Sequence, residues 1–182
     1  MSFLKSLPDE TTLLQVFQAY PGPAHHLLAF HELLLRGESP FTPGEREMIA
    51  AYVSGLNSCA YCHGIHTVTA EAFGIPEGVL AAAVADLDSS PVDDKLKPVL
   101  AYVGKLTRTP SRMTEADAGA VFAAGWSERA LHDAVLVCAL FNFMNRMVEG
   151  LGIRADQAYS TTSGERLAEG GYAGLAGLLP EG

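Results

Sequence analysis

The sequence predicts an all-α protein, and three observations support this fold class. Alanine and leucine are abundant, runs of β-branched residues are scarce, and apolar residues recur at intervals of three and four along most of the chain. That interval is the period of an amphipathic helix, whereas a half-buried strand alternates every two residues. We therefore expect a succession of helices joined by turns.

The first half of the chain carries the clearest helix boundaries. A helix over residues 10–20 is expected to stop at the Pro-Gly-Pro turn 21–23, and a second helix should cover 24–36. The segment Thr42–Glu45 then supplies a hydroxyl N-cap, a proline at the first helical position and a glutamate at the third, which is the capping-box arrangement. The helix that it opens should run to about Leu56.

A second helix start follows directly. Asn57 and Ser58 are both good N-cap residues, so we expect a break and a new helix there. This helix should hold Cys59 and Cys62 in about its first turn and run to Phe73.

The remaining apolar periodicity predicts four more helices and a tail. The helices cover residues 77–86, 93–107, 115–124 and 128–150. The last of them is the most apolar and is expected to be the core helix. Residues 154–182 are richer in glycine and polar residues, and we interpret them as a loosely docked tail with one short helix. The chain 1–182 is predicted to be a single domain around a motif core at about 43–75.

The composition excludes several classes of protein. With 182 residues, 48% of them hydrophobic and 18% charged, the chain has an ordinary globular composition for one domain. A formal charge of −9 argues against binding to nucleic acid, which needs a basic surface. We find no secretory signal and no apolar run that approaches a membrane span, so we expect a cytoplasmic protein. Three cysteines, an odd number, do not suggest a structural disulfide framework.

The candidate chemistry lies around the Cys-x-x-Cys pair. At 100° per residue, His66 returns to within roughly 20° of Cys59, so Cys59, Cys62 and His66 share one helix face. The two sulfurs are then close enough to form a disulfide. His66 lies about one turn beyond Cys62, where it can accept or return a proton.

The start of a helix is a favourable place for a reactive cysteine. Exposed amide groups and the positive end of the helix dipole stabilise a thiolate, which is the nucleophilic form. By this argument Cys59, nearer the helix end, is the more activated sulfur. Glu47 lies on the preceding helix, and if the two helices fold back at 57–58 its carboxylate can orient His66 or share its proton. The pattern indicates a thiol enzyme.

Glu47 followed by Cys59, Tyr61, Cys62 and His66 resembles the active-site signature of the AhpD-like alkylhydroperoxidases within the carboxymuconolactone decarboxylase family. Further stretches look like the peroxidase-related subgroup of this family: Pro-Ala-His-His, Thr-Pro-Gly-Glu-Arg-Glu, Ser-Gly-Leu-Asn and a late Phe-Asn with Asn-Arg. The resemblance extends from about residue 20 to about residue 155.

The resemblance implies an all-α fold and a protein that assembles into homo-oligomers, either trimers or hexamers. It also implies that the protein reduces hydroperoxides and that its cysteines form a disulfide in the process. An external dithiol, a reductant protein or a lipoyl-type donor, then reduces the disulfide, with no cofactor or metal. By the family pattern Cys62 attacks the peroxide, Cys59 resolves it, and Glu47 with His66 forms the proton relay. We follow this assignment, although helix position alone favours Cys59.

One position departs from the family pattern. The best-known members have a histidine where this chain has Tyr61. Tyrosine is a weaker proton carrier near neutral pH. A relay step that uses the histidine must therefore be altered or bypassed here.

Other interpretations of the cysteine segment stay open at this point. Cys59, Cys62, His63 and His66 could bind zinc, although a structural zinc usually draws its second pair of ligands from another segment. The string Cys-Ala-Tyr-Cys-His also matches a c-type haem attachment site, which requires export. The alternative functions are a non-catalytic metal-binding or redox-sensing helical oligomer, and a related reaction on a carbon substrate.

Several polar residues elsewhere have a structural interpretation. Cys138 is expected to be a small buried hydrophobe inside an apolar helix. The histidines at 25, 26 and 31 are interpreted as helix-surface or pocket-lining residues. Asn142, Asn145 and Arg146 lie beside the most apolar helix, where inter-helix hydrogen bonds, subunit contacts or ligand binding would explain them.

Overall fold

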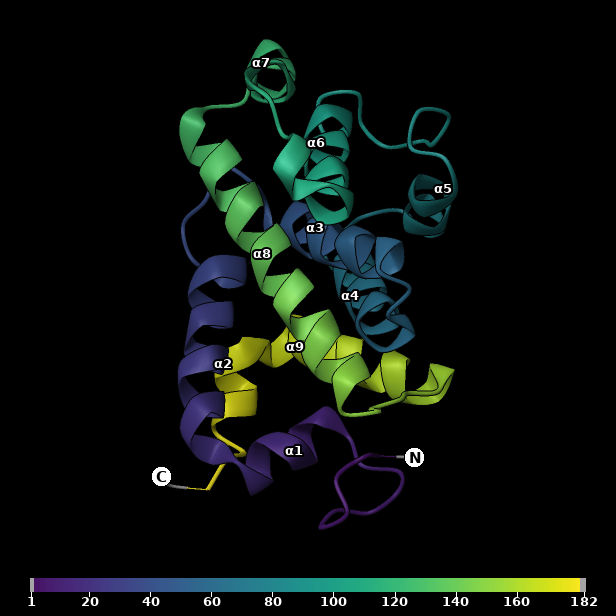
Figure 1. Ribbon diagram of the computed structural model, residues 1–182, viewed down its shortest axis with the longest axis vertical. Helices are drawn as coiled ribbons and strands as arrows, with labels where there is room; N and C mark the ends of the chain where they lie inside the picture. Colours follow the sequence, from purple (N-terminus) through teal and green to yellow (C-terminus); the bar gives the residue numbers. More distant parts are fainter. Residues whose placement is uncertain (1, 181–182) are drawn as a thin grey trace.

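The computed structural model describes residues 2–180, and over this range the chain folds into nine α-helices and one 3₁₀ turn, with no strand. The elements are α1 (Leu13–Ala19), α2 (Pro21–Arg36), α3 (Pro43–Leu56), α4 (Ala60–Ala72), α5 (Val79–Ala85), α6 (Lys97–Arg108), η1 (Pro110–Arg112), α7 (Glu115–Ala123), α8 (Glu128–Gly150) and α9 (Gln157–Ala176). The predicted all-α fold is confirmed. In Figure 1, α8 runs diagonally across the molecule, with α2 on one side and α3 and α6 on the other.

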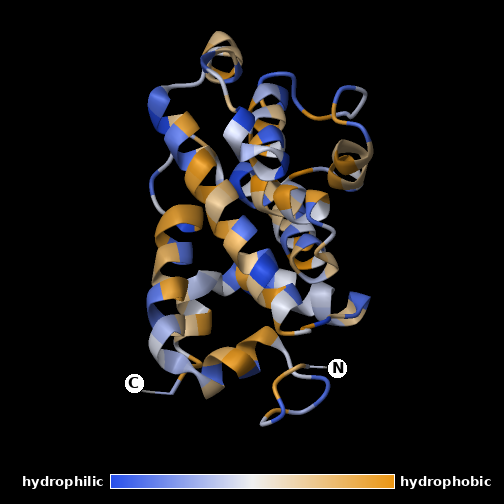
Figure 2. Ribbon diagram, in the orientation of Figure 1, coloured by the Kyte–Doolittle hydropathy of each residue, from blue (hydrophilic) through white to orange (hydrophobic). Residues whose placement is uncertain are grey.

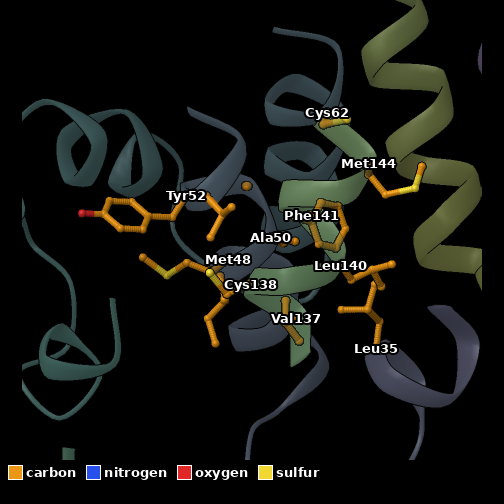
Figure 3. Close-up of a cluster of buried hydrophobic side chains, with 14 of the residues drawn as sticks. Leu35, Met48, Ala50, Tyr52, Cys62, Val137, Cys138, Leu140, Phe141 and Met144 are labelled. Atoms are coloured by element: carbon orange, nitrogen blue, oxygen red, sulfur yellow. The ribbon is translucent and has the colours of Figure 1, made fainter. Parts of the chain in front are cut away.

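Helix α8 is the core helix that the sequence predicted. It begins after Ser127, whose hydroxyl accepts a hydrogen bond from the backbone N–H of Ala130 at 3.2 Å. Its buried positions recur mostly at intervals of three and four: Ala130, Asp133, Ala134, Val137, Cys138, Leu140, Phe141, Met144, Asn145 and Val148. Figure 2 shows that hydrophobic and hydrophilic residues alternate along α8. Figure 3 shows the apolar side chains of α8 in a cluster to which α2 and α3 also contribute. No helix among the described residues is long and apolar enough to cross a membrane.

Helix α3 begins at the predicted capping box. The Thr42 hydroxyl accepts a hydrogen bond from the Glu45 N–H at 3.2 Å, and the Glu45 carboxylate accepts one from the Thr42 N–H at 2.7 Å. Helices α3 and α4 then fold back on each other as a hairpin. This hairpin brings side chains from the middle of α3 against the first turns of α4.

The predicted start of the cysteine helix at Asn57 or Ser58 is wrong by one or two residues. Asn57 ends α3, Ser58 takes a left-handed conformation with φ of 57°, and Cys59 itself is the N-cap of α4. The Cys59 N–H donates to the Ser54 carbonyl at 3.0 Å, which closes the turn. Cys62 is the third residue of the helix, so the two cysteines still occupy its first turn.

The predicted stop at 21–23 is also wrong, because α2 begins there. Pro21 and Pro23 both lie in the first turn of α2. Proline is tolerated at that place, since the first N–H groups of a helix have no partner within the helix. The chain changes direction one residue earlier, at Tyr20, which ends α1.

The interpretation of 154–182 as a loosely docked tail is wrong. Residues 157–176 form α9, which packs against α4 and α2, while 181–182 lie outside the described residues. Gly164 permits the close packing against α4, since a Cβ added there would lie 2.6 Å from the Cβ of Val68. At this position, a glycine of the segment that looked loose lets two helices approach closely.

Candidate active site

The folded chain brings Glu47 of α3 and His66 of α4 into direct contact. The Glu47 Oε2 atom lies 2.6 Å from His66 Nδ1, and the two side chains are 0% and 9% exposed. A carboxylate only accepts hydrogen bonds, so Nδ1 carries the hydrogen and Nε2 is the remaining nitrogen of the ring. The His66 ring meets the Phe141 ring edge to face, with centroids 4.5 Å apart.

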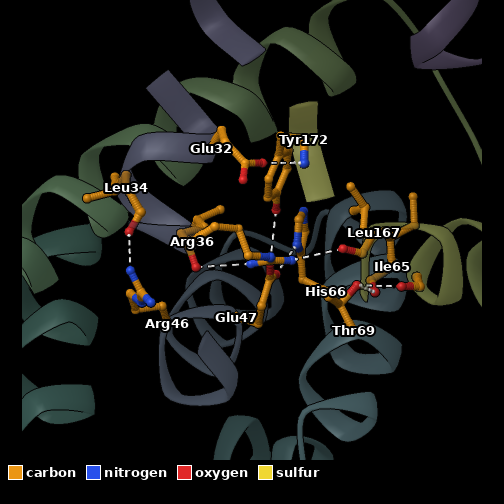
Figure 4. A network of polar contacts seen from close by, with 12 residues as sticks. Glu32, Leu34, Arg36, Arg46, Glu47, Ile65, His66, Thr69, Leu167 and Tyr172 are labelled. Atoms are coloured by element: carbon orange, nitrogen blue, oxygen red, sulfur yellow. Dashed lines mark hydrogen bonds and ion pairs between the residues drawn. The ribbon is translucent and has the colours of Figure 1, made fainter. Parts of the chain in front are cut away.

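Two residues that the sequence analysis did not select complete the surroundings of Glu47. The Arg36 guanidinium pairs with Glu47 Oε1 at 2.6 Å, and the Tyr172 hydroxyl donates to the same oxygen at 3.1 Å. Figure 4 shows these contacts meeting at Glu47 from α2, α4 and α9. Burial raises the pKa of Glu47, but the charges and hydrogen bonds of His66 and Arg36 outweigh burial and hold that pKa below its usual value. Glu47 is therefore ionised at neutral pH.

Arg36 is held in place by aromatic rings and a backbone carbonyl. Its guanidinium lies 4.8 Å from the centre of the Phe73 ring and 5.2 Å from that of Tyr172. A second nitrogen donates to the Leu167 carbonyl at 3.2 Å. In the sequence Arg36 is the last residue of a predicted helix, where the helix dipole by itself favours a basic side chain. Its role beside Glu47 has no local signal.

Tyr172 reaches Glu47 because α9 is kinked one residue earlier. Gly171 has φ of 62°, a conformation that favours glycine. After the kink the helix restarts, and the carboxylate of Glu32 accepts hydrogen bonds from the N–H groups of Tyr172 at 2.7 Å and Ala173 at 3.0 Å. The isolated aromatic residue in Gly-Gly-Tyr-Ala-Gly is the signal that could have indicated this position.

The two thiols differ in their access to a pocket. Cys59 is 0% exposed, whereas Cys62 is 3% exposed and lines a cavity of about 80 Å³. The pKa of Cys59 is lowered, chiefly by its hydrogen bond with the Cys62 thiol, against the effect of burial. The same interaction, together with burial, raises the pKa of Cys62. Within the pair, Cys59 is the more acidic thiol and Cys62 is the one that faces the pocket.

Asn145 of α8 links the cysteine helix to α3. Its side chain donates to the Ser54 hydroxyl at 3.0 Å and accepts from the Asn57 side chain at 2.9 Å. It also hydrogen-bonds to Cys62, which acts to lower the pKa of that thiol. Of the interpretations offered for Asn145, the structure supports inter-helix hydrogen bonds.

Tyr61 lies on the pocket but points its hydroxyl to another tyrosine. The hydroxyl donates to that of Tyr159 at 3.1 Å, and the two ring centroids are 5.7 Å apart. Burial, followed by the proximity of Tyr159, raises the pKa of Tyr61 well above its usual value. Tyr61 is therefore a fixed phenol at neutral pH and does not carry protons.

The pocket is mainly apolar and draws its walls from α1, α2, α4, α8 and α9. Leucine, isoleucine, methionine and phenylalanine side chains make up most of its lining. Cys62 and His66 both face it, which places a thiol and the Glu47-paired imidazole at the same cavity. Among residues 2–180, no three side chains of the His, Cys, Asp or Glu type lie together as a metal site.

The fold and the site together define the class of protein: an all-α protein in which two thiols lie near a buried carboxylate–imidazole pair. Solved structures share this fold. One is an alkylhydroperoxidase AhpD core, an uncharacterized peroxidase-related protein from Ralstonia eutropha, with a TM-score of 0.75 and 22% identity over 82% of this chain and 78% of that chain. Another is an uncharacterized peroxidase-related protein from a Silicibacter species, with a TM-score of 0.70 and 26% identity over 86% and 90% of the two chains. A protein of unknown function from Agrobacterium tumefaciens, whose description also refers to AhpD, aligns at 17% identity with a TM-score of 0.67 over 80% of this chain and 99% of that chain.

A similarity to a known family lies in the sequence of α2 to α5. Residues 21–97 match the carboxymuconolactone decarboxylase family, and this segment contains Glu47, Cys59, Cys62 and His66. The chain is thus similar to that family over 21–97 and has an AhpD-like fold, in agreement with the resemblance drawn from the motif. Among curated proteins, none matches the sequence significantly.

Proposed function

We propose that this protein is a thiol-dependent peroxidase that reduces hydroperoxides through a dithiol–disulfide cycle of Cys59 and Cys62. The observation that carries the proposal is the arrangement of Cys62 and His66 on one apolar pocket, with Glu47 2.6 Å behind the imidazole. The peroxidase-related descriptions of the structural neighbours support the same activity. The apolar lining favours organic hydroperoxides over hydrogen peroxide as substrates.

In the first step Cys62 reacts with the hydroperoxide. His66 accepts the thiol proton, because the raised pKa of Cys62 means that the thiol needs a base. The thiolate attacks the O–H oxygen, so that an S–O bond forms while the O–O bond breaks. Sulfur is oxidised to a sulfenic acid, and the peroxide is reduced to an alkoxide, which takes the proton back from His66 and leaves as an alcohol.

In the second step Cys59 resolves the sulfenic acid. Its sulfur attacks Cys62, the S–S bond forms and the S–O bond breaks, and the oxygen leaves as water after taking up a proton from solvent. An external dithiol then reduces the disulfide by thiol–disulfide exchange and is itself oxidised. The lowered pKa of Cys59 suits this role, because the resolving sulfur must also attack as a thiolate.

Access decides which cysteine attacks the peroxide. Cys59 has the lower pKa, in agreement with its position at the helix end, yet it is fully buried and does not line the pocket. Cys62 lines the pocket beside His66. A hydroperoxide that enters the pocket meets Cys62 first, which supports the assignment implied by the family pattern.

Glu47 has a narrower role in this mechanism than a full proton relay would give it. Its lowered pKa keeps it ionised, so it does not itself hold the transferred proton at neutral pH. It fixes the tautomer of His66 and stabilises the imidazolium that forms when His66 takes the thiol proton. Arg36 and Tyr172 in turn hold the Glu47 carboxylate.

Thiol counting tests the cycle directly. Addition of one equivalent of cumene hydroperoxide to the reduced protein should remove two of its three thiols. The Cys138→Ser variant should also lose two thiols, because Cys138 lies in the core beside Thr107 and away from the pocket. A bound zinc ion with no thiol loss would instead support the metal-binding alternative.

Variants separate the roles of the two cysteines. Cys62→Ser should abolish oxidation by the hydroperoxide, whereas Cys59→Ser should stop at a sulfenic acid on Cys62, which dimedone traps for detection by mass spectrometry. Glu47→Gln should slow the oxidation by on the order of a hundredfold, as expected when a general base loses its partner. The exposed Glu77→Gln is the matched control and should react like the wild type. Sulfenic acid found on Cys59 in the Cys62→Ser variant would reverse the assignment.

A further inference from the structure

His31 is a second imidazole on the same pocket, and the proposed cycle does not use it. It lies on the inner face of α2, is 3% exposed and lines the cavity together with Cys62 and His66. Its ring packs against that of Tyr172 with centroids 5.0 Å apart and against that of Phe141 with centroids 6.0 Å apart. Since His66 also meets Phe141, the two imidazoles contact the same aromatic ring.

The backbone of α2 fixes the tautomer of His31. Its Nδ1 atom lies 2.8 Å from the Leu27 carbonyl oxygen. A carbonyl only accepts hydrogen bonds, so Nδ1 carries the hydrogen and Nε2 carries the lone pair. Burial, the largest influence, lowers the pKa of His31 to about 4, against the smaller opposing effect of the Leu27 hydrogen bond. At neutral pH the ring is therefore uncharged and its Nε2 can only accept a hydrogen bond.

Among residues 2–180 the acceptor nitrogen of His31 has no hydrogen-bond partner. Within residues 2–180 the hydrogen bond to Leu27 is the one that the ring makes, and most of the surrounding pocket wall is apolar. Aromatic packing alone would be satisfied by phenylalanine at this position, without the cost of burying a polar nitrogen. An unpaired acceptor in an apolar pocket favours a ligand that brings a hydrogen-bond donor.

The two imidazoles of the pocket have complementary hydrogen-bonding capacities. His66 becomes a donor once it has taken the Cys62 proton, because Nδ1 stays bound to Glu47 and Nε2 then carries a hydrogen. His31 remains an acceptor throughout. An organic hydroperoxide offers one O–H donor at its terminal oxygen and an acceptor at the oxygen next to carbon.

We propose that His31 binds the terminal O–H of an organic hydroperoxide through Nε2 and so orients that oxygen toward Cys62. This inference rests on the proposed peroxidase function and adds a substrate-contacting residue to it. During the attack the hydrogen stays on the oxygen that is transferred to sulfur, and His31 then accepts the hydrogen bond of the sulfenic acid. No proton moves to His31, and His66 supplies the one that the alkoxide needs.

Two amide variants test whether Nε2 of His31 contacts the substrate. In His31→Asn the shorter side-chain amide can replace the Nδ1 bond to the Leu27 carbonyl but lacks a group at the position of Nε2. In His31→Gln the longer side chain places its amide near the position of Nε2. We expect His31→Asn to lower the second-order rate constant for oxidation by cumene hydroperoxide about five- to tenfold, the loss of one hydrogen bond, and His31→Gln to lower it less.

Alkylation by N-ethylmaleimide distinguishes substrate binding from general damage. The reagent reacts with the same thiol but has no O–H or N–H group to donate to Nε2, so both variants should alkylate within about twofold of the wild-type rate constant. His26→Asn, an exposed residue of the same helix, is the matched control and should leave both rate constants unchanged.

Three results would overturn the inference. Oxidation of His31→Asn at the wild-type rate would show that Nε2 does not contact the substrate. An equal fall in oxidation and alkylation would show that His31 acts only by supporting the fold around Cys62. A wild-type protein that loses no thiols to hydroperoxide would remove the proposed function itself, and with it this role for His31.

Discussion

The hydroxyl of Tyr172 donates a hydrogen bond to the carboxylate of Glu47 at 3.1 Å, although the two residues are 125 positions apart in the sequence. The contact joins the last helix of the chain to the buried pair of Glu47 and His66. It also gives one carboxylate three partners, since Arg36 pairs with the oxygen that Tyr172 binds and His66 with the other. A buried charge needs such partners, because few solvent molecules stabilise it.

Removal of the Tyr172 hydroxyl should alter the pH dependence of the reaction. In Tyr172→Phe the ionised Glu47 loses one hydrogen bond, so its pKa rises and the acid limb of the rate of thiol oxidation moves to higher pH. The rate at neutral pH should fall by up to about tenfold. Tyr102→Phe, away from the pocket, should keep the wild-type profile. An unchanged acid limb in Tyr172→Phe would show that Tyr172 only fills space.

The kink in α9 should be sensitive to a single methyl group. In Gly171→Ala the added Cβ would lie 2.7 Å from the Glu32 carboxylate, at a φ that disfavours alanine. We expect a loss of about 1–3 kcal/mol in the free energy of unfolding and a slower thiol oxidation, because Tyr172 shifts. Gly170→Ala has open space around its Cβ and should be neutral or slightly stabilising. Urea unfolding of both variants makes the comparison, and equal effects would contradict it.

Loss of Arg36 should destabilise the fold in a pH-dependent way. Arg36→Met leaves Glu47 buried with one charged partner fewer, which should cost about 3 kcal/mol of unfolding free energy at pH 7. The wild-type pKa of Glu47 is lowered, so its stabilising contribution is present above the ordinary carboxyl pKa and is lost as the pH falls through the lowered value. The difference between wild type and variant should therefore shrink in acid.

A surface ion pair provides the control for Arg36. Arg154 pairs with Glu149 at 2.8 Å, but both side chains are more than a third exposed. Arg154→Met should cost less than about 1 kcal/mol in the same unfolding measurement. A similar loss for both variants would show that the position of Arg36 beside Glu47 confers no special stability.

His31 should make the protein less stable in mild acid. Its pKa falls from about 6.5 in the unfolded chain to about 4 in the fold, with His66, Glu47 and Tyr172 as its titratable neighbours. Between these values the unfolded chain binds a proton that the folded chain does not, so stability declines as the pH drops from 7 to 4. The decline due to His31 should be about 3 kcal/mol. His31→Phe should lack it, while His26→Phe keeps the wild-type pH dependence, as urea unfolding at the two pH values would reveal.

Local sequence signals determined the helices and the position of the cysteine pair. The capping box at Thr42 and the apolar period of α8 act within a few residues, and the structure has both helices where the sequence predicts them. The spacing of Cys62 and His66 predicts that they share one helix face, since a helix repeats every 3.6 residues, and both line the pocket. Cys59, the N-cap residue before the helix, does not line it. The sequence allowed a contact between Glu47 and His66 without requiring it. The hairpin of α3 and α4 brings the two side chains to 2.6 Å from each other.

Only the tertiary structure decided what surrounds Glu47 and what forms the pocket. Arg36 ends a helix, and Tyr172 follows glycines in a segment interpreted as a tail, so neither carries a local pattern that points to Glu47. Glycine is found both in loose segments and in closely packed helices, and the sequence alone does not distinguish these two settings. The distinction depends on which helix lies opposite, as Val68 lies opposite Gly164, and that is settled by packing between elements far apart in the chain.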